Sequence, residues 1–290
     1  MVPIPTTLPH TGWQAVPIMC ELVAFSSSLP EHLTFSLHTL AARGGRGMST
    51  RDGWGVAFYQ GVDVALFREP FAAGDSDLVR FLESHGPSTQ LAISHIRHAT
   101  RGAITLANTQ PFARELGGRL HVFAHNGNLP GIDDSALLTA GPYRPVGQTD
   151  SELAFCALLA RLNGLWTGDA PPSLDARASL LAAFAADLRP LGPANFLYAD
   201  GEALFAHGNR RIQGATGQIA PPGLWLLERH CRPGDPAPDC DGGVAIGTGE
   251  RSLVLVASVP LSSDDEWRPL SEGELVVVRE GKVLTARSPV

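Results

Sequence analysis

The chain has 290 residues, 44% of them hydrophobic and 18% charged, and its 22 basic and 29 acidic side chains give a formal net charge of -7. It is long enough to bury a sizeable core. Lysine and arginine are scattered rather than clustered, which argues against a nucleic-acid partner. No apolar run approaches the roughly 18 to 20 residues that span a bilayer, so no membrane association is predicted and a small-molecule partner is favoured.

The cysteines and the first residues bear on the compartment of the protein. Four well-separated cysteines, at positions 20, 156, 231 and 240, do not suggest a disulfide scaffold, so a cytoplasmic protein is expected. Residues 1–19 contain four prolines and lack the basic and apolar regions of a signal peptide. We expect residues 1–19 to be a disordered leader or a mis-assigned start, and residues 20–290 to form a single domain.

The first half of that domain is predicted to be rich in strands. "CELVAF" from Cys20 reads as a strand, and Pro30 followed by "EHLTFSLHTLAARGG" predicts a helix of about three turns. "WGVAFYQGVDVALFRE" predicts two strands around a turn at Gly61. Residues 90–100 and 120–129 are further strand-like runs that end in polar residues, which are good positions for functional side chains.

The pattern changes after Asp150. "DSELAFCALLARL" and "SLDARASLLAAFAADLRPLG" show a 3.6-residue apolar period and predict two helices packed on a sheet. Short strand-like runs and turns follow, to the end of the chain. Strands, then helices, then strands indicate a mixed α+β layered fold.

Six polar segments between residues 20 and 152 carry a recognisable pattern. They are Cys20, "RDGWGVAFY" (51–59), "SHIRHATRG" (94–102), "NTQPF" (108–112), "HNGNL" (125–129) and "GQTDSE" (147–152). In order and approximate spacing they resemble the class II glutamine amidotransferases, whose glutaminase domains are N-terminal-nucleophile (Ntn) hydrolases. The resemblance implies a four-layered αββα sandwich formed by one amidotransferase domain over residues 20–290. The chain is most similar to short standalone members, such as the γ-glutamyl hydrolases of glutathione and ergothioneine pathways.

Cys20 is the candidate nucleophile. A lone cysteine in an apolar run is more often a small buried residue of a strand, and the resemblance reverses that interpretation. A thiol with a pKa near 8.5 is only partly ionised at neutral pH. If Cys20 is the first residue of the mature chain, its own α-amine, with a pKa of about 7.7 to 8.0, is the base that takes the thiol proton.

The resemblance also implies the roles of five other residues. Asn126 and Gly127 match the oxyanion hole, although Asn-Gly alone is a turn signal. Arg97 matches the arginine that binds the substrate α-carboxylate, and a planar guanidinium can donate two parallel hydrogen bonds to a carboxylate. Thr100 matches a residue that helps to hold the substrate, and stabilisation of a turn is an equally good interpretation. Asp150 matches the carboxylate that binds the α-ammonium, and Asp150 or Ser151 also looks like a helix cap.

No cofactor is predicted, and the histidines do not indicate a metal site. His95, His98 and His125 lie near the proposed site, but their spacing matches no zinc pattern. His230 and Cys231 open a proline-rich segment that extends to Cys240 and Gly243, and we expect it to be a surface loop.

These residues predict cysteine-dependent hydrolysis of a γ-glutamyl amide, either glutamine or another γ-glutamyl compound, through a γ-glutamyl thioester. His98, Arg101 and Gln110 depart from residues common in synthase-linked members, so the residues that would contact the leaving group are not predicted. One alternative is a glutaminase that supplies ammonia to a separate synthetase partner. Another is a non-catalytic interaction protein, which would hold if residues 1–19 stay attached to Cys20.

Overall fold

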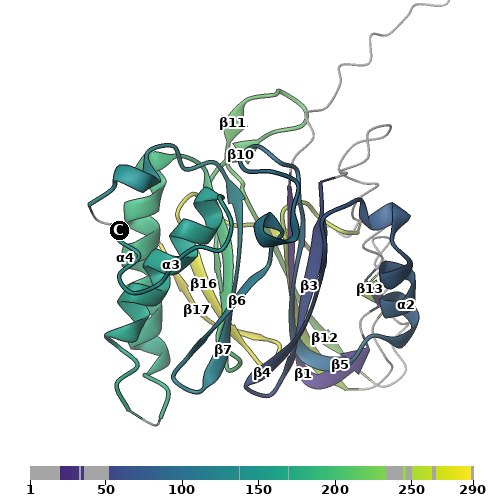
Figure 1. Ribbon diagram of the computed structural model, residues 1–290. Helices are drawn as coiled ribbons and strands as arrows, with labels where there is room; N and C mark the ends of the chain where they lie inside the picture. The colour runs from purple at the N-terminus through teal and green to yellow at the C-terminus, as the bar shows by residue number, and fades with distance from the viewer. Residues whose placement is uncertain are drawn as a thin grey trace, which may run out of the picture.

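The computed structural model describes residues 20–32, 34–35, 52–136, 138–168, 170–232, 244–245, 250–262 and 266–288. Within these ranges a seven-stranded and a six-stranded antiparallel sheet pack face to face (Figure 1). The seven-stranded sheet has the order β15 (Arg268–Pro269), β12 (Trp225–Cys231), β14 (Arg251–Ala257), β1 (Glu21–His32), β5 (Ser88–Ile96), β3 (Trp54–Gln60) and β4 (Asp63–Glu69). The six-stranded sheet has the order β17 (Lys282–Arg287), β16 (Leu275–Arg279), β9 (Leu204–His207), β8 (Ala194–Ala199), β7 (Arg119–Gly127) and β6 (Phe112–Leu116).

Strand β1 is buried on both of its faces from Glu21 to Ser27. Leu22 and Ala24 belong to the apolar cluster between the sheets, together with Val122 of β7. The alternate residues Val23 and Phe25 belong to a second cluster on the outer face of the seven-stranded sheet. Because successive side chains of a strand point to opposite faces, an almost continuous apolar run is what such a central strand requires.

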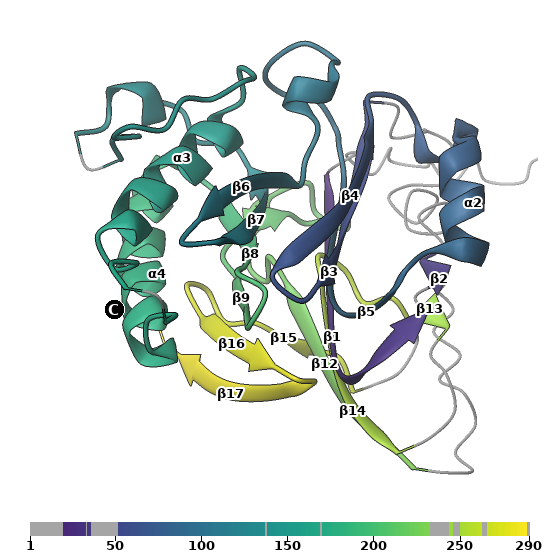
Figure 2. The ribbon, with the colours of Figure 1, turned by 60° about the horizontal axis from the view of Figure 1, so that its bottom comes forward.

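Helices cover both outer faces of the sandwich (Figure 2). Helices α3 (Asp150–Asn163) and α4 (Leu174–Leu188) pack on the six-stranded sheet, where the ring of Phe155 stacks on Phe123 with centroids 5.3 Å apart. On the other side, α2 (Asp77–His85) places Val79 and Leu82 in the same cluster as Phe25. The four-layered αββα fold and the two helices predicted after Asp150 are therefore confirmed, as are the strands on either side of Gly61.

Short elements complete the described chain. They are the strand pairs β10 (Arg211–Ile212) with β11 (Ile219–Ala220) and β2 (Thr34–Phe35) with β13 (Val244–Ala245), and 3-10 helices at Ala73–Asp75, Leu106–Asn108, Ile132–Asp134 and Arg189–Leu191. The β10–β11 hairpin projects from the upper end of the sandwich in Figure 1.

Two local predictions are wrong. The helix expected from Pro30 does not begin there, because β1 continues to His32 and pairs with β5 across a register shift between Ser26 and Glu31. The rest of that predicted helix lies outside the described residues, apart from the strand at Thr34–Phe35. His230 and Cys231 end β12 rather than open a loop, since each pairs with β14. Residues 1–19 and 233–243 lie outside the described residues.

Four chain segments meet at one end of the sandwich. In the antiparallel pair of β1 and β5, Glu21 lies opposite Ile96, so the start of β1 is beside the end of β5. The end of β7 reaches the same place, where the Asn126 side chain bonds the carbonyl oxygen of Cys20. Asp150 at the start of α3 lines a cavity with Cys20. The predicted site residues therefore lie together at this end of the sandwich.

Candidate active site

Cys20 directly precedes β1. The backbone N–H of His98 donates a hydrogen bond to the Cys20 sulfur at 3.1 Å, and the thiol donates one to the carbonyl oxygen of His98 at 3.2 Å. Burial raises the pKa of Cys20 to about 11, and the His98 backbone contact lowers it to a smaller extent. The thiol is therefore protonated at neutral pH, and a nucleophilic role requires a base that removes its proton.

Asn126 and Gly127 lie beside Cys20 at the end of β7. Asn126 Nδ2 donates to the Cys20 carbonyl oxygen at 2.5 Å, while the Asn126 carbonyl accepts from Asn195 Nδ2 at 3.1 Å. A Cβ atom on Gly127 would lie 1.8 Å from the carbonyl oxygen of Pro193, so a side chain would push away the backbone just before β8. Only glycine lets the backbone pass this close, as at other tight strand contacts.

A small polar cavity of about 20 Å³ adjoins the thiol. Five of the six predicted residues line it, namely Cys20, Arg97, Thr100, Gly127 and Asp150. The sixth, Asn126, lines the neighbouring cavity with Cys20. Residues from distant parts of the chain thus lie together as the motif order predicts. Thr100 is the exposed member of the group.

The buried guanidinium of Arg97 organises the loop after β5. Its Nη1 donates to the carbonyl oxygens of Asp52 and Ala103, both at 3.3 Å. Its Nη2 donates to those of Arg101 at 3.1 Å and Gly102 at 3.3 Å. All these partners are neutral carbonyls, so within the described residues no carboxylate is hydrogen-bonded to this cation. An anionic group entering the cavity would form a stronger, charge-assisted bond.

Asp150 is the first residue of α3, and its carboxylate is buried. Oδ2 accepts from the backbone N–H of Leu129 at 2.7 Å, and Oδ1 accepts from that of Ser151 at 2.9 Å. The helix cap is Thr149, whose hydroxyl accepts from the N–H of Glu152 at 3.2 Å, so the prediction that Asp150 or Ser151 caps the helix is wrong. The anionic side chain is favoured at this end of the helix dipole.

Gln110, His125 and Ser151 support the site, and no supporting contact was predicted for any of them. Gln110 accepts from the N–H of His125 at 2.7 Å and donates to its carbonyl oxygen at 3.1 Å. His125 Nδ1 lies 2.9 Å from the hydroxyl of Ser151. Gln110 and His125 thereby connect β7 to the start of α3. Both belong to recognised sequence segments, but the pattern contains no signal for their mutual contact.

A larger cavity of about 350 Å³ opens on the other side of Cys20. It shares Cys20, His98, Thr100 and Gly127 with the small cavity, so the two spaces meet at the thiol. Its other walls are mostly apolar and include Pro130, Leu191, Pro193, Ile212 and Ile219. The site therefore has a polar side and an apolar side.

Comparison with known proteins shows the family of this chain. The family model described as "Glutamine amidotransferases class-II" matches residues 19–289. The chain belongs to this family. The amidotransferase is 34% identical to YafJ of Escherichia coli (strain K12), over 88% of this chain and 96% of that protein. It is 30% identical to protein MJ1515 of Methanocaldococcus jannaschii, over 92% of this chain and 71% of that protein.

Comparison with solved structures supports the Ntn hydrolase fold. The crystal structure of a predicted glutamine amidotransferase from Pseudomonas aeruginosa PA01 matches with a TM-score of 0.66 at 32% identity, covering 92% of this chain and all of the other. The glutamine phosphoribosylpyrophosphate amidotransferase of B. subtilis matches with a TM-score of 0.52 at 18% identity, over 92% of this chain and 49% of the other. At this identity, the match to the B. subtilis enzyme shows only that the present chain shares its Ntn hydrolase fold.

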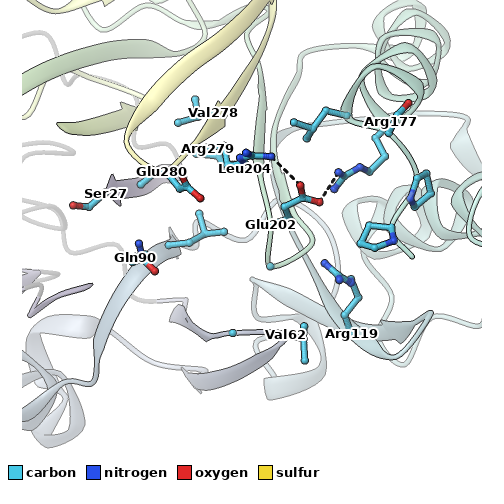
Figure 3. A pocket seen from close by; sticks show the side chains of 18 residues that line it. Ser27, Val62, Gln90, Arg119, Arg177, Glu202, Leu204, Val278, Arg279 and Glu280 are labelled. Carbon is cyan, nitrogen blue, oxygen red and sulfur yellow. Dashed lines mark hydrogen bonds and ion pairs between the residues drawn. The ribbon is translucent and has the colours of Figure 1, made fainter. Parts of the chain in front are cut away.

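The amidotransferase has a cavity of about 760 Å³ away from Cys20 (Figure 3). Glu202 lies near its centre and accepts hydrogen bonds from Arg177 at 2.6 Å and Arg279 at 3.1 Å. Arg119, also in this cavity, donates to the carbonyl oxygen of Asp200 at 3.1 Å. None of the predicted site residues lines this space, and its charges are largely paired with one another. The candidate active site is therefore assigned to the cavities at Cys20, because they contain the predicted site residues, although the cavity around Glu202 is larger.

In the described ranges, no group of three or more His, Cys, Asp or Glu side chains is arranged to hold a metal ion. The same ranges contain no helix that is long and apolar enough to cross a membrane.

Proposed function

We propose that this amidotransferase hydrolyses a γ-glutamyl amide, with Cys20 as the nucleophile. The observation that carries the proposal is the position of the Cys20 thiol, at the junction of a polar cavity containing Arg97 and Asp150 with a second cavity. The charged residues around the first cavity can bind a glutamyl head group once its space of about 20 Å³, room for about one water molecule, widens beside exposed Thr100. The other cavity can hold whatever is attached to the γ-nitrogen. The scissile bond would lie between them, next to the sulfur.

The polar cavity suits the two charges of a glutamyl head group. The α-carboxylate would replace neutral carbonyl partners of Arg97, which gives the guanidinium an anionic acceptor. The α-ammonium would meet Asp150, whose oxygens already accept from backbone N–H groups and so are held in position. Recognition of both charges places the γ-amide carbon near Cys20 and lowers the entropic barrier to attack.

Removal of the thiol proton requires a base near Cys20, because burial raises the pKa of this thiol to about 11. We propose that the base is the α-amine of Cys20, freed by loss of residues 1–19. The family match begins at residue 19, immediately before Cys20, which supports this start. A free amine with a pKa of about 7.7 to 8.0 can hold a proton taken from sulfur and pass it to the departing nitrogen.

The reaction would proceed through two tetrahedral intermediates. Thiolate attack on the γ-carbon forms the C–S bond and an oxyanion, which the second N–H of Asn126 Nδ2 and the backbone N–H of Gly127 would stabilise. Such donors are worth about 2.7 to 4 kcal/mol each in comparable sites. Collapse breaks the C–N bond, and the leaving amine takes the proton from the α-amine. Water then hydrolyses the γ-glutamyl thioester, which releases glutamate and restores the thiol.

The test is release of glutamate from a panel of γ-glutamyl compounds and glutamine, with intact mass measured on the same sample. A species that begins at Cys20 should be active, and its Cys20→Ala variant should lose activity while keeping the thermal unfolding midpoint. Equal activity of the variant would refute the mechanism. Activity that appears only after a synthetase is added would favour an ammonia-supplying subunit. An inactive protein that retains residues 1–19 in the cell would favour the interaction protein.

A further inference from the structure

The apolar cavity is larger than glutamine hydrolysis requires. Its volume of about 350 Å³ lies at the lower end of the range for small-molecule sites, whereas the leaving group of glutamine is only ammonia. Leu191 and Pro193, between α4 and β8, form one apolar wall, and Ile212 and Ile219 of the β10–β11 hairpin form another. Such walls favour an apolar body attached to the γ-nitrogen.

The hairpin wall is anchored to the strand that follows the nucleophile. Arg211 Nη2 donates to Glu21 Oε1 at 3.0 Å, and both side chains are buried. Arg211 Nη1 donates to the carbonyl oxygen of Ser258 at 2.5 Å, which holds β10 against the end of β14. Loss of one partner of a buried ion pair is strongly destabilising, so this wall keeps a fixed position relative to Cys20. The cavity is therefore preformed.

Arg210 gives the apolar cavity one cation that a ligand can use. Arg211 is neutralised by buried Glu21, whereas Arg210 pairs at 3.1 Å with Glu272 in a contact where the two side chains are 41% and 47% exposed. An exposed ion pair contributes only about 0 to 1 kcal/mol, so a ligand carboxylate can replace Glu272 at little cost. The cavity thus has apolar walls and one cation, Arg210, whose partner Glu272 can be replaced by a ligand carboxylate.

Building on the function proposed above, we propose that the preferred substrates are γ-glutamyl dipeptides with an apolar second residue. The side chain of that residue would pack between Pro193 and Ile212, and its carboxylate would pair with Arg210. In the reaction, the amide C–N bond breaks as the Cys20 C–S bond forms, and the apolar amino acid leaves with the proton taken from the thiol. Water then converts the thioester to glutamate, so only one water molecule is consumed.

The test compares kcat/KM for glutamine, γ-glutamyl-glycine, γ-glutamyl-leucine and γ-glutamyl-isoamylamide, the last of which lacks the second carboxylate. We expect γ-glutamyl-leucine to exceed glutamine by about tenfold or more, because the methylene groups of an apolar side chain contribute about that much discrimination. Ile212→Ser should lower the ratio of leucine substrate to glutamine about tenfold. Ile219→Ser, at a more exposed position of the same wall, should also lower the ratio of leucine substrate to glutamine. It replaces Ile212→Ser as the test if that variant does not fold.

Arg210→Gln separates charge from shape. It should lower kcat/KM for γ-glutamyl-leucine about tenfold and leave γ-glutamyl-isoamylamide unchanged, because only the first has a carboxylate to lose its partner. The matched controls are Arg80→Gln, an exposed arginine of α2, and Val62→Ser, an exposed apolar residue of the β3–β4 turn. Both controls should leave all four substrates unchanged.

The outcomes distinguish this inference from the function on which it rests. If glutamine is cleaved as fast as γ-glutamyl-leucine, or if the hairpin variants affect both equally, the apolar substrate class is wrong while γ-glutamyl hydrolysis stands. If Arg210→Gln slows both leucine and isoamylamide substrates equally, carboxylate recognition by Arg210 is wrong. If a protein that begins at Cys20 cleaves none of the four compounds, the function itself fails.

Discussion

The two sides of Cys20 are built in different ways. On the polar side, Arg97 and Asp150 are buried and fixed by hydrogen bonds to backbone groups, around a space of about 20 Å³. On the apolar side, Ile212 and Ile219 border a space of about 350 Å³ whose walls are mostly apolar. Charge recognition demands a fixed geometry, whereas apolar packing demands mainly volume and shape. The polar side therefore suits one constant group, and the apolar side suits a group that differs among substrates.

The largest predicted effect belongs to the junction of the two sides. Asn126→Ala should lower kcat by about 100- to 1,000-fold for every γ-glutamyl substrate, because it removes the proposed oxyanion donor, which acts on all of them alike. Steady-state kinetics with glutamine and γ-glutamyl-leucine measures the effect. The control is Asn163→Ala, at the exposed last residue of α3. A loss seen with only one of the two substrates would contradict a shared role.

The next effect tests the polar side alone. Asp150→Asn keeps an oxygen that can accept from Leu129 N–H but removes the negative charge, so kcat/KM should fall about 100-fold for all substrates. The loss should be independent of the leaving group, since the α-ammonium is common to all of them. Asp77→Asn, at an exposed position of α2, is the control. A loss that grows with the size of the leaving group would remove the distinction between the two sides.

The pH profile gives the smallest effect, about tenfold per pH unit. For a chain that begins at Cys20, kcat/KM should rise as the α-amine loses its proton and level off above about pH 8. A chain with residues attached before Cys20 lacks this base, so its activity should keep rising toward the raised thiol pKa of about 11. The profiles for glutamine and γ-glutamyl-leucine should coincide. A different profile for each would mean that the apolar side supplies an acid or base.

The sequence predicts the polar side of the site better than the apolar side. Arg97, Asn126 and Asp150 lie in segments whose order and spacing resemble those of a known family, and that resemblance is what points to them. The apolar walls leave no such pattern. Ile212 and Ile219 lie in two-residue strands, which are too short to show a period, and apolar residues at these positions look like any other.

Local elements were predicted least well where tertiary contacts outweigh local preference. Pro30 suggested a helix start, but the register shift between Ser26 and Glu31 lets β1 pass through the proline and continue pairing with β5. Helix α2 was not predicted, although Ser76 caps it through a hydrogen bond from the N–H of Val79 at 3.0 Å. A serine followed three residues later by a buried valine is a weak signal in isolation.

The central position of β1 also has a practical consequence for producing the enzyme. An affinity tag placed before Cys20 would turn its α-amine into an amide, and the linker would begin next to the two cavities that Cys20 lines. Arg287, at the end of edge strand β17, contacts Ser179 of α4 at 3.0 Å, on the helix-covered face of the other sheet. A tag after this strand leaves Cys20 unmodified, and an amino-terminally tagged preparation provides a reference of almost identical composition that lacks the α-amine.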